Sequence, residues 1–119
     1  MATLATVAVA IVAALHIGFL ILEMFLWTKP LGRRVFGLQA DFANASSALA
    51  ANQGLYNGFL AAGLIWGLLA DANRLGLLTF FLVCVIAAGI YGAITVSRSI
   101  LVVQAAPAVV ALALVLLAR

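Results

Sequence analysis

The chain has little of what soluble proteins use for charge, metal binding and cross-linking. Of its 119 residues only 8% are charged, and there is one cysteine and one histidine. A lone Cys84 excludes an intrachain disulfide, and one cysteine with one histidine is too few for a metal or bis-histidine haem site within one chain. We therefore expect no metal and no cofactor, and we interpret Cys84 as a small buried hydrophobic residue.

What the chain has in excess is hydrocarbon. Hydrophobic residues make up 68% of it and the mean hydropathy is +1.33, far outside the range of soluble globular domains. Four apolar runs, each near the roughly 20 residues that cross a bilayer core, lie at about 4–27, 49–70, 75–97 and 99–118. The first run lacks a positive n-region and is longer than a signal-peptide core, so we expect it to be retained. The sequence predicts an all-α integral membrane protein in which residues 1–119 form a single transmembrane domain.

The connections between these runs differ in length. Residues 71–74 and 97–99 form turns so short that the runs they join must be antiparallel neighbours. This predicts a four-transmembrane-helix antiparallel bundle.

The remaining connection, Thr28 to Ala48, is long and basic. It places apolar side chains at helical spacing, namely Leu31, Val35, Leu38 and Phe42. A short amphipathic helix lying on the membrane surface fits this spacing. An irregular basic loop is the alternative, because Pro30, Gly32 and Gly37 weaken a helix.

Basic residues set the expected orientation. The long connection and the third turn carry Lys29, Arg33, Arg34 and Arg98, against Arg74 and Arg119 on the opposite side. Since basic residues favour the cytoplasmic side, we expect the long connection in the cytoplasm and both termini outside. The expected location is the cell inner (plasma) membrane, with several passes.

Strongly polar side chains gather in one half of the predicted bundle. With the spans threaded in antiparallel order, the half next to the long connection holds Glu23, Asn52, Gln53, Tyr56, Asn57, Tyr91, Thr95 and Gln104. The other half holds mainly Thr3, Thr6 and Thr79, whose hydroxyl groups can bond their own helix backbone. Span ends alone would scatter polar residues over both halves, so we predict one polar pocket opening toward the long connection. Its expected ligand-binding residues are Asn52, Gln53, Tyr56, Asn57, Tyr91 and Gln104.

Glu23 and His16 are the candidate catalytic residues. A carboxyl group within a membrane span usually faces the bundle interior and marks a functional site, and no span offers Glu23 a basic partner. It must be held by neutral donors or carry a proton, unless it reaches water near Lys29. His16 lies two turns earlier on the same face, about 10 Å deeper, so the two side chains could flank one elongated pocket. A structural hydrogen-bonding role is the alternative for His16.

Small residues recur every four positions along the second and third spans. Gly54 and Gly58 form one such face of the second span, and Gly63 and Gly67 form another. Such faces let membrane helices approach closely, and two faces exceed what one neighbour needs, so we expect a homo-oligomer. Pro107, one turn after Gln104, is expected to kink the fourth span.

Three groups of residues resemble the motifs of a known family. They are His16, Phe19, Glu23 and Trp27; the stretch Asn52, Gln53, Gly54, Tyr56, Asn57, Gly58 and Phe59, followed by Ala61, Ala62 and Gly63; and Gln104, Pro107 and Ala108. Together they resemble the small bacterial membrane proteins of domain-of-unknown-function family 1304, over essentially the whole chain. The resemblance implies four spans and a bacterial inner membrane, and it carries no mechanism.

Three function classes fit these observations. The first is an enzyme or binding protein for a lipophilic small molecule, with Glu23 as acid or base and the amide and tyrosine side chains orienting a polar head. Four-span enzymes of eicosanoid and glutathione metabolism are similar in architecture, but their Arg-x-x-x-Asn-x-x-Glu pattern is absent, which argues against glutathione.

The second class is a proton-coupled exporter, because small multidrug-resistance transporters are similar in length and carry a single glutamate in their first span. The position of Glu23 near the membrane edge and the long basic connection argue against it. The third class is a structural subunit that binds a partner helix. The expected partners are membrane lipids, a lipophilic ligand and further copies of the chain, with no nucleic acid; the reaction, if there is one, stays open.

Overall fold

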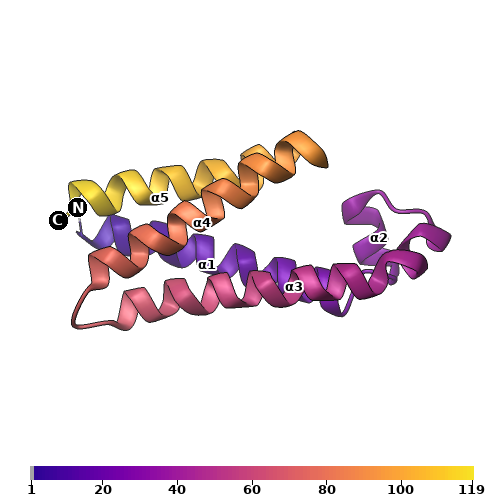
Figure 1. The fold of residues 1–119 in the computed structure, drawn as a ribbon, viewed down its shortest axis with the longest axis horizontal. Coiled ribbons are helices and arrows are strands. Elements are labelled where there is room, and N and C mark those ends of the chain that lie inside the picture. Colours follow the sequence, from indigo (N-terminus) through magenta and orange to yellow (C-terminus); the bar gives the residue numbers. More distant parts are fainter. Residues whose placement is uncertain (1) are drawn as a thin grey trace. The chain divides into compact units, whose positions relative to one another are not determined.

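The computed structural model describes residues 2–119, and the regular structure within this range is entirely helical. Its elements are α1 (Ala2–Met24), α2 (Pro30–Phe36), α3 (Ala40–Leu69), α4 (Arg74–Thr95), the π-helical segment η1 (Leu101–Ala105) and α5 (Ala106–Leu117) (Figure 1). The all-α prediction is confirmed. Within the described range, α1 and α4 are long and apolar enough to cross a membrane, and Leu101–Leu117 is a shorter apolar stretch.

Helix α3 differs most from its predicted span. It begins at Ala40 rather than near residue 49 and runs for 30 residues. The added turns are rich in alanine and serine, and Asp41 lies in the first turn, where a negative charge interacts favourably with the helix dipole. Hydropathy does not detect this extension because the added segment is helical but polar.

The long connection contains both of the alternatives expected for it. Lys29 is extended, as a residue before proline tends to be, and Pro30 then opens the seven-residue helix α2. Gly37 ends that helix in the left-handed conformation, with φ of 65°. Leu31 and Val35 therefore share α2, whereas Leu38 follows it and Phe42 belongs to α3, so the predicted four-residue apolar stripe is divided between elements.

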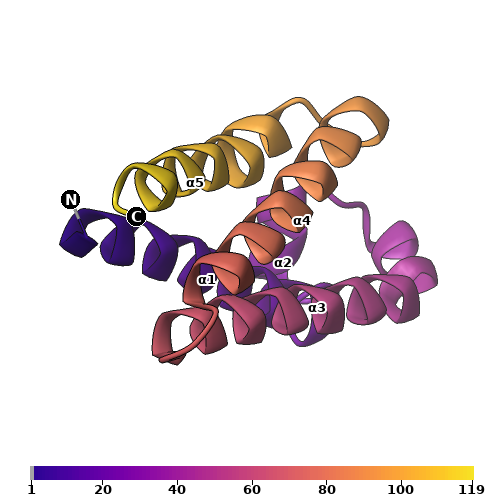
Figure 2. The ribbon, with the colours of Figure 1, turned by 60° about the vertical axis from the view of Figure 1, so that its left-hand side comes forward.

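The helices divide into two compact units, His16–Phe59 and a second one made of the start of the chain and residues 60–119. In the second unit, four helices supply one apolar core: Ala5, Val9 and Val12 from α1, Leu64 from α3, Leu78, Leu82 and Val85 from α4, and Ala108, Ala111 and Val115 from α5. Helices α4 and α5 run antiparallel side by side (Figures 1 and 2). The backbone of η1 also approaches α4 closely at Gly89, where an added Cβ would lie 2.8 Å from the backbone nitrogen of Ala105.

The irregularity expected at Pro107 lies just before it. The backbone N–H of Ala106 donates to the carbonyl oxygen of Leu101, five residues back, and closes the wide turn of η1. Pro107 occupies the first turn of α5, where its missing N–H costs least. Gln104 thus lies within a π-helical segment, a feature that frequently occurs at functional sites.

Candidate functional site

Glu23 and Asn57 form a buried pair in the unit His16–Phe59. The amide Nδ2 of Asn57 donates to Oε1 of Glu23 at 3.1 Å, and the two residues are 8% and 5% exposed, respectively. The second carboxyl oxygen, Oε2, is also buried and has no hydrogen-bond partner among the described residues. The pair therefore leaves one carboxyl oxygen able to accept a further hydrogen bond or to exchange a proton.

Glycines of α3 allow α1 and α3 to approach each other closely at the Glu23–Asn57 pair. A Cβ on Gly54 would lie 2.7 Å from Cγ of Met24 and 3.1 Å from Cβ of Glu23, and one on Gly58 would contact the Leu20 side chain. The Gly54 and Gly58 face of α3 therefore lies against α1. In the other unit, Gly63 lies against Phe81 of α4 and Gly67 against Leu78, so both small-residue faces of α3 are occupied by helices of the same chain.

The connection between α1 and α3 packs against the end of α1, and Trp27 joins it to the first turns of α3. Trp27 donates from its ring nitrogen to Oγ of Ser46 at 3.0 Å, and its ring lies 4.9 Å from that of Phe36, centroid to centroid. Gly32 is buried because the backbone carbonyl of Leu26 occupies the place of a Cβ. These contacts fix the chain that follows Glu23 and hold α2 against the end of α1.

The other predicted site residues of this unit have different surroundings. The side chain of Gln53 lies beside the Glu23 carboxyl group, although Gln53 as a whole is exposed. Asn52 is exposed, and Tyr56 is 55% exposed with its ring near that of Phe59. His16 is fully buried, and its ring meets the edge of Phe19 at a centroid distance of 5.2 Å.

Tyr91 and Gln104 belong to the other unit. Tyr91 is 71% exposed, and its backbone carbonyl accepts a hydrogen bond from Thr95. Gln104 is half-buried in η1. The structure thus brings Glu23, Gln53 and Asn57 together.

Comparison with known proteins identifies the family. A family model described as "Protein of unknown function (DUF1304)" matches residues 10–116. The chain belongs to this family. It is also 29% identical over 113 residues to the uncharacterized protein YpaA of Lactococcus lactis subsp. lactis, a match that covers 92% of this chain and 95% of YpaA. No solved structure matches the chain.

One of the motifs that resemble the DUF1304 family, the stretch from Asn52 to Phe59, includes the residues of α3 that meet the carboxyl group. Gly54, Asn57 and Gly58 lie about one turn apart on the face of α3 that meets Leu20 and Glu23, whereas Asn52 and Tyr56 lie off that face. The glycines allow the close approach, and the asparagine supplies the donor.

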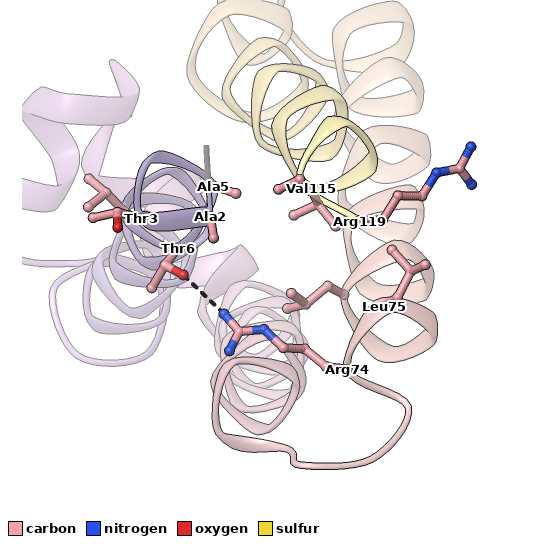
Figure 3. Close-up of a pocket in the computed structure, with 11 residues that line it drawn as sticks. Ala2, Thr3, Ala5, Thr6, Arg74, Leu75, Val115 and Arg119 are labelled. Carbon is pink, nitrogen blue, oxygen red and sulfur yellow. Dashed lines mark hydrogen bonds between the residues drawn. The ribbon is translucent and has the colours of Figure 1, made fainter.

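Sequence reasoning missed a second polar contact in this DUF1304 protein. Thr6 was expected to bond its own helix, but its Oγ1 accepts a hydrogen bond of 3.0 Å from Nη2 of Arg74 (Figure 3). Both residues line a cavity of about 500 Å³ among the described residues of α1, α4 and the end of the chain. No local signal could have revealed it, because the two residues are 68 positions apart.

Proposed function

We propose that this DUF1304 protein crosses a bacterial inner membrane four times and binds or transforms a lipophilic small molecule at Glu23. The proposal rests on one observation, the buried Glu23–Asn57 pair whose Oε2 has no hydrogen-bond partner among the described residues. A buried polar atom without a partner is costly, so a ligand that donates a hydrogen bond there gains affinity. Glu23 then acts as acid or base, and Gln53 and Asn57 orient the polar head of the ligand.

The membrane arrangement assigns one span to each long apolar segment. Helices α1 and α4 are long enough to cross, and the stretch Leu101–Leu117 supplies a third span. The 30 residues of α3 extend about 45 Å, more than the roughly 30 Å hydrocarbon core. Its first turns then project beyond the hydrocarbon, together with α2, on the cytoplasmic side.

Two substitutions at Glu23 test the proposal. Glu23→Gln keeps the shape and hydrogen-bonding capacity and removes the titratable proton, so we expect an unchanged melting temperature and loss of a small-molecule adduct seen by native mass spectrometry in mild detergent. Glu23→Ala should also lower the stability by about 1–2 kcal/mol, because it leaves the Asn57 amide unpaired. Asp71→Asn, the same chemical change at an exposed carboxyl group in the turn before α4, is the matched control and should change neither quantity.

A Glu23→Gln protein that keeps its adduct contradicts the proton-transfer role. The same carboxyl group also supports a proton-coupled exporter, in which Glu23 trades its proton for a lipophilic cation. Proton release when tetraphenylphosphonium is added to the detergent-solubilised protein, abolished by Glu23→Gln, would favour this second candidate over the first.

A further inference from the structure

The cavity beside Arg74 lies in the unit that does not contain Glu23. At about 500 Å³ it is within the range of about 300–1,000 Å³ typical of small-molecule sites. Its lining is mostly alanine, valine and leucine, including Ala5, Leu75 and Val115. The interior is therefore suited to hydrocarbon.

The polar part of the lining is confined to two threonines and two arginines, with no acidic side chain among the lining residues. Figure 3 shows the guanidinium group of Arg74 directed across the cavity toward Thr6, while the guanidinium group of Arg119 extends away at the outer edge. Arg74 is exposed although it donates to Thr6, so its remaining N–H groups stay accessible. The cavity thus combines an apolar interior with a positively charged rim.

A second depression, of about 680 Å³, shares Leu75 and Arg119 with the first. It is also mainly apolar, with Phe80 and Val83 among its lining residues. An amphiphile with two chains would find two neighbouring apolar surfaces that share Leu75 and Arg119. Such a surface suits a diacyl lipid better than a compact soluble anion.

We propose that this cavity binds the headgroup and an acyl chain of an anionic phospholipid. Arg74 is the main partner of the phosphate, because guanidinium groups donate paired hydrogen bonds to phosphate oxygens. Thr6 positions Arg74, and Arg119 adds a second positive charge at the rim. The chain of the lipid lies against Ala5, Leu75 and Val115. The site is independent of the chemistry proposed for Glu23.

Lipid titration followed by native mass spectrometry tests this site. The full chain in mild detergent is titrated with dioleoyl phosphatidylglycerol, with dioleoyl phosphatidylcholine and with inorganic phosphate. Since a basic residue at a membrane surface contributes about 1 kcal/mol, we expect phosphatidylglycerol to be retained more strongly and each arginine-to-glutamine change to weaken it about fivefold. The double variant Arg74→Gln/Arg119→Gln should therefore lose the preference for phosphatidylglycerol.

The matched control is Arg34→Gln/Arg98→Gln, which removes the same charge from two exposed arginines outside the cavity. It should keep the preference, and so should Glu23→Gln. Arg119→Gln alone covers the case in which the double variant does not fold. Equal retention of the two lipids, an equal loss in the control pair, or complete displacement of phosphatidylglycerol by inorganic phosphate would each overturn the proposal.

Discussion

At the scale of single residues, Asn57 is the asparagine of α3 that donates a hydrogen bond to Glu23. It is buried, whereas Asn52 on the same helix is exposed. The difference follows from helix geometry: Asn57 is three residues beyond Gly54, on the side that meets α1, and Asn52 is not. Amides that look alike in the sequence are therefore distinct in the folded protein.

A double-mutant cycle measures the interaction free energy between Glu23 and Asn57. Asn57→Leu leaves Oε1 of Glu23 without its donor, and we expect a loss of about 1–2 kcal/mol in the free energy of unfolding. Adding Glu23→Met should recover much of this loss, since an apolar pair leaves nothing unpaired. Asn52→Leu, at an exposed amide, should change stability by less than about 0.5 kcal/mol. Additive losses in the cycle would mean that the two side chains do not interact.

At the scale of elements, glycine determines which helices approach each other. Gly54 and Gly58 admit α1, Gly63 and Gly67 admit side chains of α4, and Gly89 admits the backbone at Ala105. The small-residue pattern of α3 is thus used within the chain and does not require a second copy. Helix α2 also packs through a glycine, because Gly32 lies against the carbonyl group of Leu26.

Substitution of Gly32 should release α2 from the end of α1. An added methyl group would overlap the Leu26 carbonyl, so Gly32→Ala should cost about 1–3 kcal/mol. We expect faster amide exchange in α2 and a red-shifted emission of Trp27, measured in a Trp66→Phe background. Gly18→Ala is the control, because no atom lies within 4 Å of its added Cβ, and there the helix should gain about 0.5–1 kcal/mol. Equal effects at the two glycines would contradict the packing of α2.

At the scale of the whole molecule, the distribution of basic residues predicts the orientation in the membrane. Single cysteines placed in a Cys84→Ser background test it at two exposed positions, Gln39 in the long connection and Asp71 in the turn before α4. A membrane-impermeant maleimide should label Asp71→Cys in intact cells and Gln39→Cys only after permeabilisation, because the long connection is the more basic. The reverse labelling pattern would invert the topology.

The homo-oligomer expected from the sequence can also be tested at the scale of the whole molecule. Because both glycine faces of α3 pack within the chain, these faces no longer argue for a second copy, and the number of copies per particle in native mass spectrometry in mild detergent decides the prediction. Gly58→Leu is unsuitable for this purpose, since Gly58 packs on Leu20 of its own chain and the variant would disturb the monomer. A strictly monomeric mass of the unmodified protein would refute the oligomer.

The sequence by itself determined the helical class, the approximate position of each long helix and the need of Glu23, if buried, for a neutral donor. It could do so because apolar run length and the cost of burying Glu23 are local properties of the chain. Only the tertiary structure decided that Asn57 is the donor, that both glycine faces of α3 are filled internally, and that Arg74 reaches Thr6. These contacts depend on how each helix is rotated and shifted against its neighbours, and in an almost uniformly apolar chain hydropathy does not specify that rotation.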